Sequence, residues 1–338
     1  MKYIFITDFP CDQTLYHAIA FDKSECRFVG MPVNEKNRIR KYRKILFYLG
    51  YFKIALKALL VSKKDDVLIS WNFNVGVCVA IWSKILFKKR KIVSLNMINH
   101  TISGMLLRFK CIIYNYVLSD PNFHMSVNGL DTLDEYAKYF KIFPDRVFNL
   151  QDTYEESYPS QSYSKGKGYV FCGGIVRDWQ VYFKAAALLP NISFIGVARK
   201  KTFTADLLKN KPDNVTMYYD INLSEFYHLL SECSVVVVPM PTKATGGLIV
   251  IFQSVFMNKP IVATSTPAIK GILNNEETGL WGGEVYELGQ PQDLANKINR
   301  VLSDEFHARM LCSVMQDNIE KFSPMNFSKT ILSYVKSI

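Results

Sequence analysis

The segment at residues 245–264 reads TGGLIVIFQSVFMNKPIVAT and predicts a turn, an apolar helix and a short strand in succession. Gly246 and Gly247 stand where the helix starts. Without a Cβ there, a ligand can approach backbone N–H groups at a helix end that favours negative charge. Gln253 lies on or near the helix face that looks back toward this turn. A Gly-Gly turn before a buried helix is also common in ordinary loops, so other segments of the chain are needed to distinguish a ligand site from such a loop.

Size and composition predict two folded domains in a reducing compartment. The chain has 338 residues, 49% of them hydrophobic and 14% aromatic, which is enough to bury two sizeable cores. The first residues, MKYIFITDFP, resemble a strand entering a loop and not a signal peptide. Polar residues interrupt the longest apolar stretch, Val67 to Phe87, which argues against a membrane span. Seven scattered cysteines without a CxxC pair favour a cytoplasmic protein with neither a disulfide framework nor a zinc site.

The net charge of +11 lies in the first half of the chain. Residues 1–150 hold 23 Lys/Arg and 12 Asp/Glu, whereas the remainder holds 18 of each. Residues 36–64 contain ten basic and no acidic residues, with apolar side chains between them at helical spacing, and residues 84–91 (KILFKKRK) repeat the mixture. Such helices suit the anionic inner face of a cell membrane, with contacts predicted at Lys41, Arg43 and Lys44. The alternatives are a core helix with a solvated basic face and, with less support, nucleic-acid binding.

Strand-like and helix-like segments alternate along the chain, which is typical of α/β folds with parallel sheets. A polar stretch at residues 152–168 (DTYEESYPSQSYSKGKG) predicts a linker between two domains. Strands are expected in the first half at residues 3–7, 67–70, 92–95, 124–127 and 146–149, and in the second half at 169–172, 192–197, 215–219, 234–239, 261–264 and 279–281. Helices are expected in the second half at residues 178–189, 223–231, 291–302, 304–321 and 326–336.

Basic and glycine residues recur at the predicted carboxyl ends of strands in the second half, where ligands bind in such sheets. The loop FCGGIVRDWQ places Gly173 and Gly174 beside Arg177, whose guanidinium suits phosphate oxygens. Arg199, Lys200 and Lys201 follow the next strand, and Lys243 lies in the loop before the segment at residues 245–264. Each is ordinary as a single surface charge, but together they favour a cleft that binds a diphosphate without a metal.

The sequence gives little support to other kinds of catalytic, nucleotide-binding or metal site. There is no GxGxxG, GxSxG, GxxxxGK[ST] or DxD motif and no His, Cys and carboxylate set with metal spacing. His100 and His124 lie near predicted strand ends. A lone His is more often structural, and His100 is the one kept as a catalytic candidate.

The second half resembles the family-4 glycosyltransferases and their relatives with the GT-B architecture of two Rossmann-like domains. The resemblance covers about residues 169–315. FCGGIVRDW is similar to the glycine-rich loop of that family, and SVVVVPMP followed by GGLIVIFQSVFMNKPIVAT is similar to its strand, nucleotide-sugar loop, helix and strand. TPAIKGILNNEETGLW resembles the family segment that ends in NGL. SVNGLDTLDEYAKYFKIFPDRVFNL matches the first domain in outline.

The resemblance implies a metal-independent, retaining enzyme that transfers a sugar from a nucleoside diphosphate sugar to a glycan acceptor. We expect an acceptor domain at residues 1–155, a donor domain at 165–322 and a helix at about 324–338 that packs back on the first. Because the first half of the chain is basic, we further expect the acceptor to be lipid-linked, as in surface polysaccharide assembly. The expected partners are the nucleotide sugar, this acceptor and the membrane, with no cofactor and no nucleic acid.

The expected site residues follow from the same resemblance. Thr245 and Gln253 occupy the positions of the family Glu-x7-Glu pair, so a carboxylate is missing near the sugar. The predicted donor-binding residues are Gly173, Gly174, Arg177, Arg199, Lys200, Thr245, Gly246, Gly247, Leu248 and Gln253. The predicted catalytic residues are Arg177, Lys243 and His100, and Asn72 and Asn74 join the basic residues on the acceptor side. The missing glutamates also allow an alternative, an inactive homologue that binds nucleotide sugar as the partner of another transferase.

Overall fold

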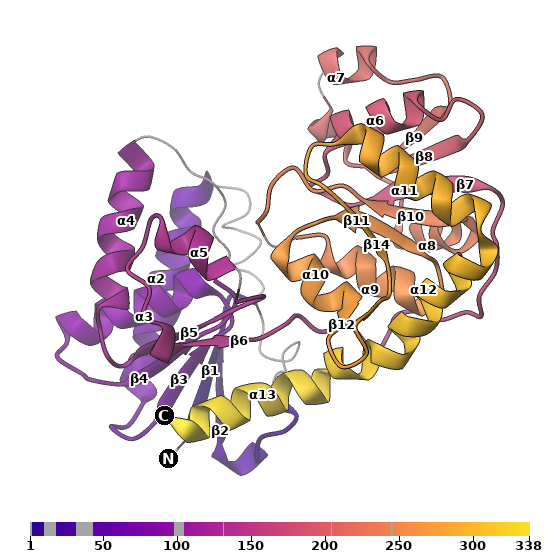
Figure 1. Ribbon diagram of the computed structural model, residues 1–338. Helices are drawn as coiled ribbons and strands as arrows, with labels where there is room; N and C mark the ends of the chain where they lie inside the picture. The colour runs from indigo at the N-terminus through magenta and orange to yellow at the C-terminus, as the bar shows by residue number, and fades with distance from the viewer. Residues whose placement is uncertain are drawn as a thin grey trace. The chain divides into compact units, whose positions relative to one another are not determined.

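The computed structural model describes residues 2–9, 18–31, 43–97, 105–130, 132–203, 205–244 and 246–338, without the side chains of residues 43–47, 105, 106, 205 and 206. The chain divides into two compact units (Figure 1). The first contains Met1–Thr153 and Ser323–Ile338, and the second contains Tyr154–Phe322.

The first unit is built around a parallel sheet of six strands in the order β2-β1-β3-β4-β5-β6. Its elements are β1 (Tyr3–Thr7), η3 (Lys23–Glu25), β2 (Cys26–Gly30), α2 (Arg43–Val61), β3 (Val67–Ser70), α3 (Phe73–Ile85), β4 (Lys91–Ser94), α4 (Met105–Leu118), β5 (Phe123–Val127), α5 (Thr132–Ala137), η4 (Pro144–Arg146), β6 (Val147–Asn149) and α13 (Pro324–Ser337). After β2 the chain crosses to the other side of β1, so the strand order reverses between β1 and β3.

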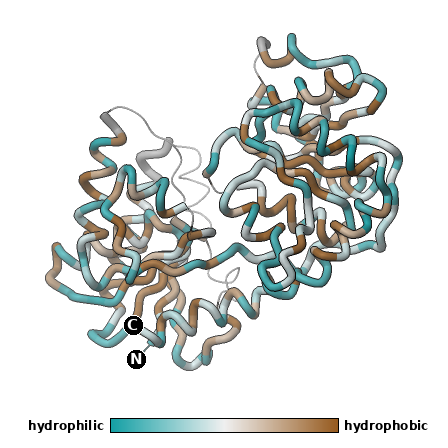
Figure 2. Tube along the Cα trace, viewed as in Figure 1, coloured by the Kyte–Doolittle hydropathy of each residue, from teal (hydrophilic) through white to brown (hydrophobic). Residues whose placement is uncertain are grey.

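Alternate residues of β1 enter different cores because side chains alternate between the faces of a strand. Ile4 and Ile6 join the core with α2, α3 and α4, whereas Tyr3 and Phe5 join the core that contains Phe327 of α13. The last helix of the chain therefore covers one face of the first sheet. Both faces are buried, which explains the apolar strands in Figure 2.

The second unit holds a parallel sheet in the order β14-β11-β10-β7-β8-β9, the strand order of a Rossmann fold. Its elements are β7 (Tyr169–Gly173), α6 (Trp179–Ala187), β8 (Ser193–Ala198), η5 (Lys200–Thr202), α7 (Ala205–Lys209), β9 (Val215–Tyr219), α8 (Leu223–Glu232), β10 (Val235–Val238), α9 (Leu248–Phe256), β11 (Ile261–Thr264), α10 (Pro267–Leu273), β12 (Asn274–Asn275), β13 (Leu280–Trp281), β14 (Glu284–Tyr286), α11 (Pro291–Ser303), α12 (Glu305–Asn318) and η6 (Ile319–Phe322). Residues of α9 and α10 pack in one of its cores, and residues of α6 and α11 pack in the other.

The predicted linker is for the most part packed against the second unit. It forms no helix or strand, but the backbone N–H of Gln161 donates to the carbonyl of Phe256, and its side-chain amide donates to Met257. Asn258 donates back to the Gln161 carbonyl at 3.0 Å. From Tyr154 onward this stretch belongs to the second unit.

Candidate functional site

In the second unit the strand order reverses between β7 and β10, which are hydrogen-bonded neighbours. The two loops at the carboxyl ends of these strands, residues 174–178 and 239–247, therefore emerge side by side. Each leads into a helix, α6 after the first loop and α9 after the second. Because ligands of doubly wound sheets bind at such a reversal, this is the expected site of the unit.

Backbone hydrogen bonds hold the two loops together. The N–H of Asp178 donates to the carbonyl of Pro239 at 2.8 Å, and the Asp178 side chain caps α6 through the N–H of Val181. The N–H of Met240 donates to Oγ1 of Thr264 at 2.7 Å, which connects the second loop to the end of β11. The loops are thus positioned by the sheet itself.

Arg177 lies between the two glycine turns. Its Nε donates to the carbonyl of Gly173 at 2.8 Å and its Nη1 to the carbonyl of Val176 at 2.6 Å. A Cβ placed on Gly174 would lie 2.4 Å from Nη2, and one placed on Gly247 would lie 3.9 Å from Nη1. Within the described residues no carboxylate lies within 4 Å of this guanidinium, so its charge is left for a ligand. Burial lowers the pKa of Arg177, but an arginine remains charged in proteins.

Both turns need glycine. Gly174 has φ +125° and Gly247 has φ +82°, in the range that residues with side chains rarely adopt. A Cβ on Gly247 would also lie 2.6 Å from Cγ1 of Val238. Gly247 is the N-cap of α9 and has no side chain to cap the first turn, so the first amides of this helix face the turn unblocked.

Gln253 is buried in α9, and its Nε2 donates to the hydroxyl of Tyr227 in α8 at 3.0 Å. No residue of the described chain donates to its Oε1. The amide is therefore oriented with its oxygen available to accept a hydrogen bond. Tyr227 is a residue that the sequence motifs did not reveal, because it comes from a different helix.

The other predicted donor residues are spread more widely. Leu248 is buried as the first residue of α9, and Gly246 lies against the Met240 side chain. Lys243 is exposed in the second loop, and Arg199 and Lys200 are exposed after β8, the neighbour of β7. No hydrogen bond connects these three side chains to Arg177 in the part of the chain that is described.

Three predicted residues, Thr245, His100 and Lys41, lie outside the described residues, and the side chains of Arg43 and Lys44 are likewise not described. His124 is the second residue of β5, so it lies toward the amino end of the strand. Its Nδ1 contacts the hydroxyl of Tyr334 in α13 at 2.9 Å, and burial lowers its pKa. This is a structural position.

In the first unit, polar residues gather where the strand order reverses between β1 and β3. Asp8 follows β1, and its Oδ2 accepts from the hydroxyl of Tyr51 at 3.3 Å and from Nδ2 of Asn72 at 3.4 Å. Asn72 also caps α3 by accepting from the N–H of Asn74. Asn74 in turn accepts from Tyr114 at 2.7 Å. The two predicted asparagines thus belong to one hydrogen-bonded cluster.

Two further asparagines continue this edge of the first sheet, Asn96 after β4 and Asn128 after β5. The Oδ1 atom of each is buried without a hydrogen-bond partner among the described residues. Such atoms are rare in folded proteins and call for an explanation such as a ligand. Asp8, Asn96 and Asn128 were missed in the sequence, although each follows a buried strand within two residues, which is a detectable signal.

The described residues hold neither a metal-binding cluster nor a membrane-spanning helix. They contain no group of three or more His, Cys, Asp or Glu side chains placed to hold a metal ion. Among them, no helix has both the length and the apolar character needed to span a membrane.

Comparison with known proteins identifies the fold and the second unit. Residues 166–304 match the family model of group 1 glycosyl transferases. HepE from Anabaena, in complex with UDP and glucose, aligns over 100% of both chains with a TM-score of 0.72 and 14% identity. OtsA without ligand aligns over 100% of both chains with a TM-score of 0.67 and 11% identity. The α,α-trehalose-phosphate synthase (UDP-forming) from Burkholderia vietnamiensis also aligns over 100% of both chains, with a TM-score of 0.64 and 10% identity.

No curated protein sequence matches the chain significantly. At the identities found, the solved structures share the fold, and the family model identifies the unit that contains Arg177 and both glycine turns. These matches confirm the predictions of a GT-B architecture and of a glycosyltransferase. The chain therefore has the GT-B fold and carries a group 1 glycosyltransferase domain at residues 166–304.

Proposed function

We propose that this protein transfers a sugar from a nucleoside diphosphate sugar, bound in the second unit, to a hydroxyl of a glycan. The observation that carries the proposal is the position of Arg177 between two glycine turns at the strand reversal of the group 1 domain. HepE is bound to UDP and to UDP-glucose in its structures, which makes UDP the first nucleotide to test.

In the reaction we propose, the bond between the anomeric carbon and the diphosphate oxygen breaks, and the acceptor oxygen forms the new bond. The leaving diphosphate gains negative charge, which Arg177 and the first amides of α9 would stabilise from fixed positions. Lys243, Arg199 and Lys200 would add positive charge near the same strand ends. Since these groups supply the charge that a metal would otherwise provide, we propose metal-independent transfer, with retention of configuration as the family resemblance implies.

We place the acceptor at the carboxyl edge of the first sheet. Asp8, Asn72, Asn96 and Asn128 offer a carboxylate and amides there, and two of their oxygens are buried without a partner among the described residues. Groups of this kind bind the hydroxyls of a sugar ring, which both donate and accept hydrogen bonds. Asp8 is suited to take the proton that the acceptor hydroxyl loses.

We further propose that the acceptor is lipid-linked, that the enzyme works at the inner face of the cell membrane, and that its product enters surface polysaccharide assembly. The basic first half of the chain supports this part, because 23 of its residues are Lys or Arg against 12 that are acidic. The predicted contacts Lys41, Arg43 and Lys44 remain to be tested by substitution.

A second function is an inactive homologue that binds nucleotide sugar and assists another transferase. The observation in its favour is the family glutamate pair, replaced here by Thr245 and Gln253. It predicts nucleotide binding without turnover on any glycan acceptor.

The first test is thermal-shift binding of UDP, GDP, ADP, CMP and TDP with EDTA present. At 100-fold excess over Kd, the right nucleotide should raise Tm by roughly 5 °C. Arg177→Ala should weaken binding by about tenfold or more because a charge-assisted bond is lost, and Gln253→Ala should weaken it less. Arg309→Ala, a surface arginine paired with Glu305, is the matched control. No stabilisation by any nucleotide would contradict the proposal, and binding without transfer would favour the inactive homologue.

A further inference from the structure

Large apolar side chains are exposed on two neighbouring helices of the first unit. They are Ile85, Leu86 and Phe87 at the end of α3, and Phe109, Ile112 and Tyr116 along α4. The three residues of α4 are spaced three and four positions apart, so they form one stripe on its outer side. Single exposed apolar residues are normal in soluble proteins, but a group of this kind marks an interaction surface. We refer to these six residues as the α3–α4 face.

Phe87 is the most unusual member of the α3–α4 face. Its side chain is 93% exposed, and its backbone has φ +53°, which residues other than glycine and asparagine rarely adopt. The turn around it is fixed on both sides, because the N–H of Lys88 donates to the Ser83 carbonyl at 2.9 Å and the Ser83 hydroxyl donates to the Lys88 carbonyl. The fold therefore holds an aromatic ring outward at a position that would suit glycine better.

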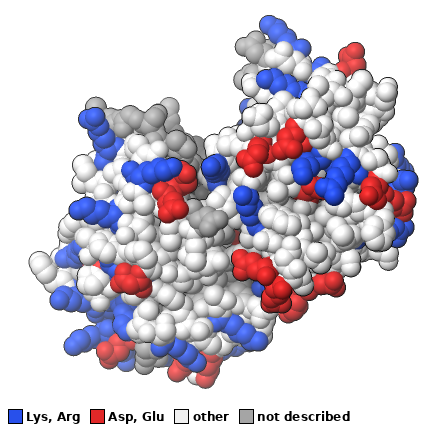
Figure 3. All heavy atoms as spheres, viewed as in Figure 1, with Lys and Arg blue, Asp and Glu red and all other residues white. Residues whose placement is uncertain are grey.

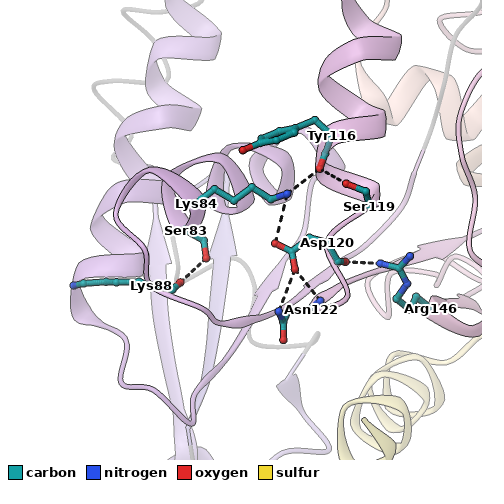
Figure 4. Close-up of polar contacts among 8 residues, drawn as sticks. All are labelled: Ser83, Lys84, Lys88, Tyr116, Ser119, Asp120, Asn122 and Arg146. Carbon is teal, nitrogen blue, oxygen red and sulfur yellow. Dashed lines mark hydrogen bonds and ion pairs between the residues drawn. The ribbon is translucent and has the colours of Figure 1, made fainter.

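Lys84 connects the two helices that carry the face. Its Nζ lies 4.0 Å above the centre of the Tyr116 ring and donates to the Tyr116 carbonyl at 2.9 Å (Figure 4). The same Nζ lies 3.8 Å from Oδ2 of Asp120, which also accepts hydrogen bonds through Oδ1 from Asn122. The last turns of α3 and α4 are thus in contact, and their apolar residues belong to one surface.

The stretch of chain that carries the α3–α4 face is basic. Residues 67–119 contain seven Lys or Arg and no Asp or Glu, and Lys88 and Lys89 follow Phe87 directly. Figure 3 shows Lys and Arg distributed over the part of the first unit that carries α3 and α4, with uncharged surface and a few Asp or Glu residues between them. The nearest following acid, Asp120, is paired with Lys84. A partner for this face must be negatively charged at its surface and able to take in apolar side chains.

We propose that the α3–α4 face is the surface by which this protein docks on an anionic lipid bilayer, with Phe87 entering the interface. An aromatic ring held outward beside lysines has the two features of interfacial anchors, apolar area to bury and attraction to anionic headgroups. The proposal rests on the membrane association proposed above and moves its contact residues from Lys41, Arg43 and Lys44 to the ends of α3 and α4.

The location is compatible with catalysis. In a parallel sheet, each connecting helix returns the chain from the carboxyl edge to the amino edge. The end of α3 therefore lies at the amino edge of the first sheet, opposite the edge that holds Asp8, Asn96 and Asn128. A bilayer at Phe87 would leave that edge uncovered, and the glycan of a lipid-linked acceptor would have to extend past the length of α3, about 20 Å, to reach it.

The test is co-sedimentation of the full chain with vesicles of phosphatidylcholine and phosphatidylglycerol in equal parts, compared with vesicles of phosphatidylcholine alone. Phe87→Gly is the decisive variant. Because the left-handed backbone favours glycine, it should keep or raise Tm, and yet weaken binding to the mixed vesicles by about tenfold. Ile112→Ser should also weaken binding, whereas Phe306→Ser should not, although Phe306 in the second unit is 80% exposed.

Several results would overturn the proposal. One is unchanged vesicle binding of Phe87→Gly and Ile112→Ser, and another is equal loss for Phe306→Ser. A concentration-dependent dimer of the wild type that either substitution dissociates would instead assign the face to a second copy of the chain. UDP binding is measured in parallel and should stay unchanged in each variant, so a failure here is distinct from a failure of the donor site.

Discussion

Tyr227 orients the side-chain amide of Gln253. The Tyr227 hydroxyl, in α8, accepts from Nε2 of Gln253, in α9, at 3.0 Å, and this leaves the amide oxygen available. The family position normally holds a glutamate, whose two oxygens are equivalent, so no such orientation is needed there. With glutamine, a neighbouring acceptor decides which amide atom faces the ligand.

Tyr227→Phe should therefore weaken UDP binding by about three- to tenfold, since the Gln253 amide loses the bond that orients it. Isothermal titration measures this. Tyr169→Phe is the control, because its hydroxyl bonds the Leu229 carbonyl of the same helix at 2.6 Å. That variant should lose stability without losing affinity. Equal affinity of the wild type and Tyr227→Phe would show that Gln253 needs no orientation.

Gly174→Ala should displace the Arg177 guanidinium, because the new Cβ would lie 2.4 Å from Nη2. We expect UDP affinity to fall about tenfold and stability to fall by about 1–2 kcal/mol from the backbone strain. Gly168→Ala is the matched control, with φ +82° and no atom within 4 Å of the Cβ. It should lose similar stability and keep UDP affinity. Loss of affinity in both variants would attribute the effect to strain alone.

Asp8→Asn should lower kcat of sugar transfer on the order of 100-fold, because the acceptor hydroxyl loses its proton acceptor. UDP affinity should not change, since Asp8 belongs to the first unit. Asp65→Asn, an exposed aspartate of the same unit, is the control and should leave transfer intact. Full activity of Asp8→Asn would remove Asp8 from the proposed acceptor site.

The second unit should unfold more readily in acid because of Glu284. Burial alone would raise the pKa of this carboxyl, but hydrogen bonds from Lys297 and His307 and the charge of Arg300 hold it below its usual value of 4.5. A lowered folded-state pKa stabilises the protein above the unfolded-state pKa, and the contribution is lost as pH falls through the folded-state value.

Glu284→Gln should accordingly cost about 2–3 kcal/mol at pH 7, because the charges of Lys297 and Arg300 lose their partner. The two proteins should converge in stability as the pH falls below 4.5 and through the lowered folded-state pKa of Glu284. Urea unfolding across this pH range measures the difference. Glu305→Gln, which breaks an exposed pair with Arg309, should change little. A constant difference between wild type and Glu284→Gln at every pH would mean that the Glu284 charge is not responsible.

The strands that the sequence predicts well are those buried on both faces. The bounds of the buried strands β1, β3 and β11 are as expected, and those of β7 and β10 differ by one or two residues. The partly exposed edge strand β9 also has its expected bounds. The missed strands are β2 and β14, which lie at the ends of the two large sheets, and the two-residue strand β12. β2 is partly exposed, and its sequence, CRFVG, carries a charged residue and lacks a continuous apolar run. β14, with the sequence EVY, is buried but too short to show a pattern. The helix α10 was missed because its seven residues make too few turns to show the periodic spacing of apolar residues that indicates a helix.

For the candidate site, the two glycine turns can be located from local sequence. Gly174 and Gly247 were predicted because only glycine combines a left-handed conformation with close approach, and both have positive φ. Arg177 was predicted because it follows Gly173 and Gly174 in the loop at the carboxyl end of the same predicted strand. These features follow from a few consecutive residues and the alternation of strands and helices.

Tertiary structure alone decided which side chains meet. Arg177 and Gly247 are 70 positions apart in the sequence, and Asp8 and Asn72 are 64 apart. The two residues of each pair approach each other because the strand order places their loops side by side. The same holds for Tyr227 with Gln253 and for Lys84 with Tyr116. Periodicity and turn chemistry act over one helix or strand, whereas such contacts depend on how separate elements pack. No local pattern in the chain encodes that packing, and it determines both the oriented amide and the exposed face.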